Sequence, residues 1–413
     1  MKKFQDLKLN ANILKAIEEL KYLTPTPIQE QAIPVILQDH DIRGSAQTGT
    51  GKTAAYILPT LQKLLTPPLQ RAVGPRALIL VPTRELAIQV AAEAAKYCKY
   101  LSKMNTVCIY GGVPYPVQNR QLSRPYDILV ATPGRLIDHL ERQRINLSQV
   151  EVLILDEADR MLDMGFIEPV EHIAAATPNT RQTLLFSATM KGNVIKLSKK
   201  LLKNPIEISV AHEHEKHEHI EQRLYYVDDL HHKQRMLSHI LDDPSINQAI
   251  VFTSTKRYAD TLVDDLADAG YDVAALHGDM DQRQRTRTIK RLKDGHIRFL
   301  VATDVAARGI DIQTITHVVN FDLPPSAEDY VHRIGRTGRA GANGIALSFA
   351  AHHDRHLVVR IEQFTGQKFV PHTIVGMEPK NKPRPASPSR KMAHKRKGEA
   401  NGAKRRGYYS RAR

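Results

Sequence analysis

The sequence predicts an α/β fold in which two mostly parallel sheets, each flanked by helices, follow one another along the chain. Three observations support this. Short apolar runs alternate with longer helical patterns as far as about residue 350. The runs are continuously apolar, which is typical of parallel strands covered by helices on both faces. With 413 residues, the chain accommodates about two or three domains of ordinary size.

Eight apolar runs bounded by Pro, Gly, Asp or Ser predict strands. They lie at residues 77–81, 127–131, 152–155, 183–186, 249–252, 299–302, 317–320 and 345–349. We therefore divide the chain into a first unit at 1–207, a linker at 208–220, a second unit at 221–370 and a basic tail at 371–413.

The composition excludes several classes of protein. Apolar residues make up 42% and charged residues 25%, which is ordinary for a globular chain and argues against a fibre or overall disorder. No stretch approaches the roughly 18 consecutive apolar residues that a membrane helix needs. The two cysteines, Cys98 and Cys108, are too few for a disulfide framework or a structural zinc site. We therefore expect a protein of the reducing cytoplasm, without a membrane partner.

Positive charge is concentrated at the end of the chain. The net charge is +15, and residues 377–413 hold thirteen Lys or Arg against two Glu. After about Val370 the chain is rich in Pro, Lys, Arg and Ser, so we expect it to be disordered from there on. A basic tail suits nucleic acid, but a tail that only keeps the protein in solution explains the composition equally well.

Within the linker, the eight residues from His212 to His219 hold four histidines and no apolar side chain to pack. One interpretation is a metal site. We favour a solvated hinge, because a flexible strip without a paired scaffold is a poor place for a metal ion.

A glycine-rich segment predicts a phosphate-binding loop, with a helical pattern directly after it. The segment comprises Ala46, Gln47, Thr48, Gly49, Thr50, Gly51, Lys52 and Thr53. Its glycines let backbone N–H groups turn toward phosphate oxygens, and the helix points its N-terminus at the anion. Lys52 then supplies charge to the β- and γ-phosphates, and the Thr53 hydroxyl is a ligand for Mg²⁺. Ala46 stands where the strict pattern has Gly.

Three carboxylates, Asp156, Glu157 and Asp159, follow the predicted strand at 152–155. They lie at the carboxyl end of that strand, where open α/β sheets bind ligands. Such a cluster needs a cation to offset its repulsion, and a nucleotide-bound Mg²⁺ meets that need. Asp156 is then the metal-side carboxylate, partly through water, and Glu157 polarises an attacking water. An isolated acidic cluster is explained by helix capping. That explanation is weaker for a cluster that accompanies a phosphate loop.

Four apolar residues just downstream are spaced like one buried helix face, so we assign them to the core: Met161, Leu162, Met164 and Phe166.

The second unit lacks a phosphate loop but holds Arg333, Arg336 and Arg339 at intervals of three. A guanidinium spreads charge over the oxygens of a transferring phosphoryl group. We therefore expect these arginines to complete a site in the first unit, so that domain motion closes the active site. The alternative is a basic loop that only binds anions.

In their order, these motifs resemble those of DEAD-box RNA helicases, superfamily-two enzymes of two RecA-like domains. The resemblance covers about residues 4–350. It implies a Q motif at residues 24–29, in which Gln29 hydrogen-bonds the adenine edge while Phe4 stacks on its face. It also implies that Arg336 and Arg339 are arginine fingers. Asp159, rather than His, separates the chain from the DEAH group.

The resemblance further implies an RNA path across both units. Its residues are Pro82, Thr83, Arg84, Gly112, Thr132, Gly134 and Arg135 in the first unit, with Thr253, Gly278, Arg285 and Thr303 in the second. Asp159, Ser187, Thr189 and His332 are implied to couple the nucleotide state to RNA. Gly309 and Asp311 are implied to complete the nucleotide site, Asp311 toward the ribose.

These features predict an enzyme that binds ATP and Mg²⁺, hydrolyses ATP with RNA bound and separates duplexes locally, with hydrolysis serving release. Few residues are placed to read base edges, so we expect low sequence specificity. The chain resembles the shorter bacterial members, which act in ribosome assembly or RNA turnover. Two alternatives stay open: a non-catalytic RNA clamp or scaffold, and a DNA translocase.

Two positions depart from the family's pattern. Lys21 replaces the usual Gly ahead of the Q motif, and residues 43–45, Arg-Gly-Ser, are more polar than the strand end expected before a phosphate loop. We expect altered local geometry at both places without the loss of a chemical group.

Overall fold

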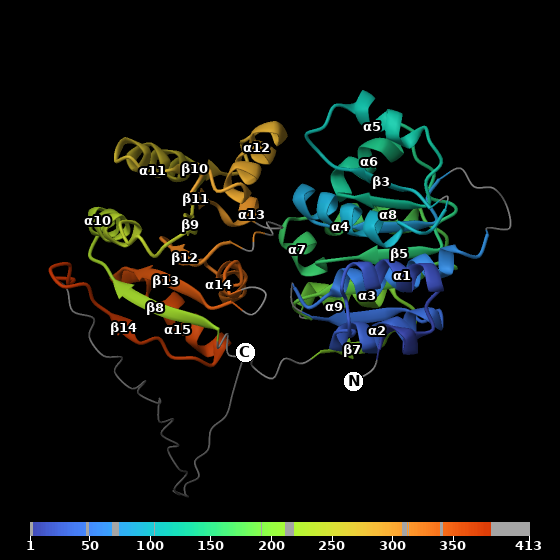
Figure 1. Ribbon diagram of the computed structural model, residues 1–413, viewed down its shortest axis with the longest axis horizontal. Helices are drawn as coiled ribbons and strands as arrows, with labels where there is room; N and C mark the ends of the chain where they lie inside the picture. The colour runs from blue at the N-terminus through green and yellow to red at the C-terminus, as the bar shows by residue number, and fades with distance from the viewer. Residues whose placement is uncertain are drawn as a thin grey trace, which may run out of the picture.

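Two seven-stranded sheets lie side by side in the computed structural model (Figure 1). The structure describes residues 3–46, 49–67, 74–102, 104–190, 192–210, 219–307, 312, 314–338 and 342–380. The paired strands are parallel in both sheets. The predicted fold class is therefore confirmed.

The first sheet consists of β1 (Ile42–Ser45), β2 (Ala77–Leu80), β3 (Thr106–Ile109), β4 (Ile128–Ala131), β5 (Val152–Leu155), β6 (Gln182–Ser187) and β7 (Ile206–Ser209). Its helices are η1 (Phe4–Leu7), α1 (Ala11–Glu19), α2 (Pro27–Leu37), α3 (Lys52–Leu64), α4 (Arg84–Tyr97), α5 (Tyr115–Leu122), α6 (Pro133–Glu141), α7 (Ala158–Asp163), α8 (Ile167–Ala175) and α9 (Gly192–Leu201).

The second sheet consists of β8 (Ile220–Tyr226), β9 (Ala249–Phe252), β10 (Val273–Leu276), β11 (Phe299–Ala302), β12 (His317–Asn320), β13 (Gly344–Ala350) and β14 (Pro371–His372). Its helices are α10 (Leu230–Leu241), α11 (Lys256–Asp268), α12 (Gln282–Lys293), α13 (Asp304–Ala307), α14 (Ala327–Ile334), η2 (His352–Asp354) and α15 (Arg355–Thr365).

Both sheets have the same topology. The strand order is β3-β4-β2-β5-β6-β1-β7 in the first and β10-β11-β9-β12-β13-β8-β14 in the second. Each strand of the second sheet thus takes the place of the strand seven before it, so one fold occurs twice in the chain.

Each sheet is covered on both faces, as the continuous apolar runs predict. Along β2, Ala77 and Ile79 belong to one buried cluster, whereas Leu78 and Leu80 belong to another on the opposite face. Alternate residues of a strand point to opposite faces, so a strand buried on both must be apolar throughout. All eight runs predicted as strands are strands.

β1 is a central strand in spite of its polar sequence. A Cβ atom on Gly44 would lie 2.7 Å from the ring of Phe186 on β6, so the bare backbone leaves room for that ring. Arg43 donates to the Ser198 hydroxyl at 3.1 Å and pairs with Glu207. The strand is therefore held by its contacts with β6, β7 and α9, which accommodate its glycine and its arginine.

Lys21, which replaces glycine ahead of the Q motif, adopts a left-handed φ of 59°, the region that favours glycine.

Three of the four residues assigned to the core belong there. Met161 is fully buried, and Leu162 and Phe166 are partly buried against the same cluster. Met164 is the exception, because α7 ends at Asp163 and the helical spacing does not continue past it.

The strands reach beyond the unit boundaries proposed from the sequence. β7 runs to Ser209, β8 begins at Ile220, and β14 lies past residue 370. The backbone carbonyl of Met377 lies 2.9 Å from Nε2 of His232, and Lys380 N–H donates to Asp228. These contacts move the start of the proposed tail to residue 381. The histidine-rich segment at 211–218 and residues 381–413 lie outside the described residues.

Among the helices of the described ranges, we find none that has both the length and the apolar character needed to cross a lipid bilayer.

Candidate functional site

The phosphate loop connects β1 to α3 and is shaped by two glycines. Gly49 and Gly51 have φ of +88° and +87°, which side chains rarely adopt. A Cβ on Gly51 would also lie 2.4 Å from Nε2 of Gln29. Gln47 and Thr48 lie outside the described residues.

Lys52 begins α3, and its ammonium group is buried. Within the described part of the chain Nζ makes no hydrogen bond, and it lies 4.0 Å from Oδ1 of Asp156. A buried ammonium without hydrogen bonds is costly unless a ligand supplies acceptors. The site thus offers unused donors where a phosphate would lie.

Asp156 follows β5 and is 3% exposed. It accepts hydrogen bonds from the Tyr56 hydroxyl and from Glu157 N–H, both at 2.9 Å. Burial raises the pKa of Asp156, and the charge on Lys52 opposes that shift. Burial and the Asp156 carboxylate also raise the pKa of Tyr56 well above its usual value, which keeps the phenol a donor. Thr53 lies in the first turn of α3, partly buried.

Glu157 links β5 to α7 in a left-handed conformation, with φ of 53° and ψ of 50°. Such a conformation is uncommon for a residue with a side chain and occurs often at functional sites. The side chain is partly buried beside the buried Asp156.

Gln29 belongs to the first turn of α2 and joins the Q motif to the phosphate loop. Its Oε1 accepts from Thr26 N–H, and its Nε2 donates to the Gly51 carbonyl, both at 3.0 Å. Phe4 is 2% exposed in the core beneath this region. Its ring is covered by protein here, so stacking on adenine stays a prediction.

Three of the four residues assigned to coupling form one hydrogen-bonded cluster. Oδ2 of Asp159 accepts from the backbone and the hydroxyl of Thr189, at 3.0 and 3.1 Å. The Ser187 hydroxyl accepts from Asp159 N–H at 3.3 Å and donates to the Thr189 carbonyl at 2.7 Å. The acidic motif after β5 is therefore tied to the segment after β6.

A cleft of about 300 Å³ lies between the two sheets on the side of α4 and α12. Eight of the residues assigned to RNA line it: Pro82, Thr83, Arg84, Thr132, Gly134, Arg135, Gly278 and Arg285. Met164, Phe166 and Val305 add an apolar part that the sequence analysis missed. Gly112 lies against Arg84, whereas Thr253 and Thr303 follow β9 and β11 and are not among the lining residues.

Side chains from both halves meet across this cleft. Arg285 donates to Glu85 at 2.9 Å through Nε and also to the His277 and Ala306 carbonyls, so it is fixed on both sides. Arg84 donates to Gln282 at 3.2 Å. Two arginines close together are thereby held at one interface, and burial together with the charge on Arg285 lowers the pKa of Arg84.

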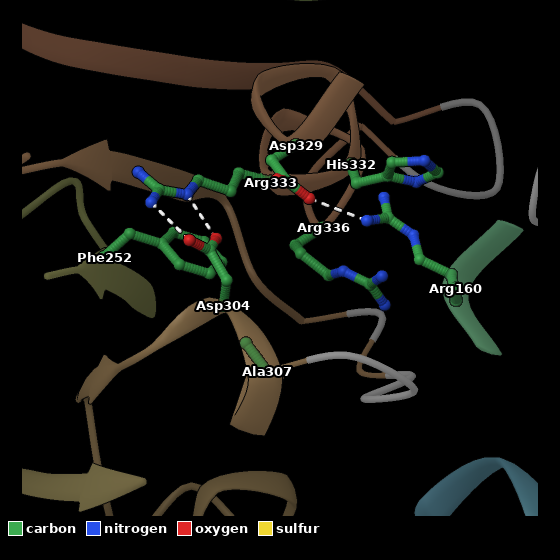
Figure 2. A pocket seen from close by; sticks show the side chains of 8 residues that line it. All are labelled: Arg160, Phe252, Asp304, Ala307, Asp329, His332, Arg333 and Arg336. Atoms are coloured by element: carbon green, nitrogen blue, oxygen red, sulfur yellow. Dashed lines mark hydrogen bonds and ion pairs between the residues drawn. The ribbon is translucent and has the colours of Figure 1, made fainter. Parts of the chain in front are cut away.

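A smaller hollow lies between α7 and α14 (Figure 2). Arg160 and the second half's Asp329, His332, Arg333 and Arg336 line it. Arg333 binds Asp304 through Nε and Nη2 at 2.6 and 2.7 Å and is 3% exposed, so it serves the fold of the second half. Arg339, Gly309 and Asp311 lie outside the described residues.

Arg160 was missed by the sequence analysis. It donates to Asp329 at 2.6 Å, across 169 residues of chain. No local pattern links two residues so far apart, so only the fold reveals the contact.

Within the described ranges, no three His, Cys, Asp or Glu side chains cluster closely enough to hold a metal ion by themselves.

Comparison with known proteins identifies the family. Residues 26–197 match the family model of the DEAD/DEAH box helicase, and residues 232–341 match that of the helicase conserved C-terminal domain. The chain is 42% identical to the ATP-dependent RNA helicase SrmB of Haemophilus influenzae, over 93% of this chain and 87% of SrmB.

Two solved structures show how the halves are arranged. The structure of S. cerevisiae Dbp5 bound to RNA and ADP BeF3 is 31% identical and has a TM-score of 0.80, over 90% of this chain and 96% of Dbp5. A DEAD box protein from Methanococcus jannaschii is more similar in sequence, at 39%, yet has a TM-score of 0.50 over 90% of this chain and 99% of that one. The two halves are thus arranged as in Dbp5. The chain belongs to the DEAD-box family of RNA helicases, with two RecA-like domains in tandem.

Proposed function

We propose that the protein is an ATP-dependent RNA helicase that closes its two domains around ATP and RNA, separates duplexes locally and hydrolyses ATP to release the RNA. The observation that carries this proposal is the cleft between the domains, because its arginines come from both halves and meet only when the halves are together. The name of SrmB and the ligands of Dbp5 support it.

The phosphates of ATP are held by the loop and by Lys52. Its buried ammonium has unused donors, which suits a β- or γ-phosphate oxygen. The N-terminus of α3 adds backbone N–H donors. Gln29 and Phe4 are proposed for adenine, and Asp311 with Gly309 for the ribose side.

Thr53 and Asp156 would hold Mg²⁺, partly through water. The fit rests on a buried carboxylate whose charge only Lys52, at 4.0 Å, offsets as an ion pair within the described residues. When bound, Mg²⁺ supplies positive charge to the β- and γ-phosphate oxygens. Asp156 must be ionised to act as a ligand, and a cation favours that form in spite of burial.

Glu157 is proposed as the group that accepts the proton of the attacking water. The water oxygen bonds to the γ-phosphorus as the bond to the β–γ bridging oxygen breaks. Arg336, with Arg339, stabilises the charge that develops on the transferring group. Because these arginines belong to the second domain, hydrolysis requires closure.

The RNA backbone is proposed to cross the cleft, in contact with the eight lining residues and with Gly112, Thr253 and Thr303. Phosphate and sugar contacts position RNA without reading its sequence, so specificity is low. Asp159, Ser187 and Thr189, with His332, relay the state of the nucleotide. We further propose a cytoplasmic role in ribosome assembly or RNA turnover.

The proposal is tested by measuring ATP hydrolysis and the unwinding of a short RNA duplex. Glu157→Gln keeps the shape of the side chain but removes the base, so hydrolysis falls by about 10² to 10⁴. Binding of ATP and RNA persists. If Glu157→Gln hydrolysed ATP at nearly the rate of the parent protein, Glu157 would not be the group that accepts the proton.

The same assay separates the alternatives. An RNA clamp without catalysis predicts RNA binding with no hydrolysis in single-turnover experiments. A DNA translocase predicts equal or stronger stimulation by DNA than by RNA. Either result in the parent protein overturns the proposed function.

A further inference from the structure

Arg160 and Asp329 form an ion pair between the two domains. Nη1 of Arg160 donates to Oδ1 of Asp329 at 2.6 Å, and the two side chains are 5% and 16% exposed. Figure 2 shows the guanidinium reaching from α7 toward α14, with this contact as a dashed line. Asp163, on the helix of Arg160, lies farther away at 3.6 Å and is largely exposed.

Both partners are held in place within their own domains. Asp329 is fixed by Ser326, whose hydroxyl donates to Oδ2 and accepts from Asp329 N–H, at 2.9 and 3.0 Å. Oδ1 is therefore directed toward Arg160. On the other side, Arg160 N–H donates to Oδ1 of Asp159 at 3.0 Å, and Oδ2 of the same carboxylate accepts from Thr189 N–H, so the backbone of Arg160 is linked to the coupling cluster.

The ion pair connects the two elements that bear the proposed chemistry. α7 begins directly after Glu157, and α14 carries His332 and leads into Arg336. A displacement of α14 relative to α7 would shift Arg336 relative to Glu157. The contact is thus placed to set the position of Arg336 relative to Glu157.

Charge explains why the pair must form on closure. Arg160 shares its hollow with Arg336 and His332, and its Nη2 is buried without a hydrogen bond among the described residues. A buried guanidinium beside another cation needs an anion in contact, and Asp329 provides it from the other domain. With the domains apart, both groups would be hydrated separately.

We propose that Arg160 and Asp329 are positioning residues that form a latch between the domains, stabilising the closed state in which Arg336 can act. This inference rests on the proposed function. It predicts that the pair contributes to the tightening of RNA binding by ATP rather than to the binding of either ligand alone.

The test compares RNA affinity in the presence of ADP and of a non-hydrolysable ATP analogue. Arg160→Gln and Asp329→Asn each reduce the ATP-dependent tightening by about tenfold, within the range typical of coupling between sites. The double variant loses no more than either single one, because both remove the same contact. RNA affinity with ADP stays unchanged.

Kinetics supply a second readout. In Arg160→Gln and Asp329→Asn, kcat at saturating RNA decreases together with the ATP-dependent tightening of RNA binding. The affinity for ADP does not change. The exchanged pair, Arg160→Asp with Asp329→Arg, recovers part of the coupling, which a merely structural role would not produce.

Arg76→Gln is the matched control. Arg76 is similarly buried, at 7% for its side chain, and pairs with Glu151 inside the first domain at 2.5 Å. Its loss lowers the melting temperature without changing the ratio of the two RNA affinities.

Two results would overturn the latch. In one, Arg160→Gln behaves like Arg76→Gln, with lower stability and unchanged coupling. In the other, the losses from the two single variants add in the double variant. Failure of the proposed function is distinct, because the parent protein itself would then show no RNA-stimulated hydrolysis.

Discussion

At the scale of single residues, the site depends on charged side chains that are buried. Lys52 and Asp156 face one another at 4.0 Å; the Lys52 ammonium makes no hydrogen bond among the described residues, and burial raises the pKa of Asp156. An environment of this kind is common where a ligand completes the site. Arg333 is the contrast, since its partners Asp304 and Asn320 lie within its own domain.

Arg336→Ala should lower kcat far more than the affinity for ATP. A finger acts on charge that develops in the transition state, and its loss costs about 10³ to 10⁵ in rate. We expect kcat at saturating RNA to fall in that range while the dissociation constant for ATP changes little. Arg235→Ala, an exposed arginine on α10, is the control. Equal effects on binding and turnover would contradict the role.

The two cysteines should react slowly in the folded protein. Burial raises the pKa of Cys98 and of Cys108 to about 12. A raised pKa favours the thiol, so at pH 8 only about one group in ten thousand is the reactive thiolate, against about a quarter in an unfolded chain. Labelling with a thiol-specific chromogenic disulfide at pH 8 should take far longer than in denaturant. Complete labelling of the native protein within the mixing time would refute the expectation.

Local motifs predicted much of the site, and contacts distant in sequence account for the rest. Lys52 and Asp156 were identified because each stands in a short pattern with chemical meaning. Arg160 was not, because its partner is 169 residues away and neither residue stands in such a pattern. Phe4 was assigned to adenine, but the structure adds its place in the core, which no motif conveys.

At the scale of elements, strands were predicted correctly where burial of both faces requires an apolar sequence. The eight apolar runs became strands because both faces of a central strand require apolar residues. β1 could not be predicted in this way, because Gly44 is adapted to Phe186 on β6. Likewise, β14 is two residues long and depends on its pairing with β8.

Gly44→Ala tests the packing of β1 against β6. The added methyl would lie 2.7 Å from the Phe186 ring, which is fully buried and also contacts Tyr56. Overpacking of this kind costs about 1–3 kcal/mol, so the urea midpoint of unfolding should fall. Gly134→Ala is the control, since nothing lies within 4 Å of its added methyl. An unchanged midpoint for Gly44→Ala would show that the ring moves aside freely.

At the scale of the whole molecule, closure joins two copies of one fold through few side chains. Arg285 with Glu85 and Arg84 with Gln282 meet on the RNA side, and Arg160 meets Asp329 near the nucleotide side. These contacts are polar, so the side chains that form them can be hydrated when the halves separate. Such an interface suits a cycle of opening and closing.

The tail should strengthen RNA binding through charge. Residues 381–413 hold twelve Lys or Arg and one Glu. If about five of them neutralise phosphates at once, the slope of log K against log salt is steeper by about 3 than in a chain ending at Lys380. kcat at saturating RNA stays the same. Parallel slopes for the two chains would favour a tail that only keeps the protein in solution.

The place of β14 bears on where the chain can be cut or extended in the laboratory. Its two residues cover part of β8, a seven-residue strand that would otherwise form the border of the second sheet. An uncovered border strand is a template on which strands of other molecules can assemble. A truncation before Pro371 would therefore leave a product prone to aggregation. Tags and end points belong beyond Lys380, where the last described contact is made.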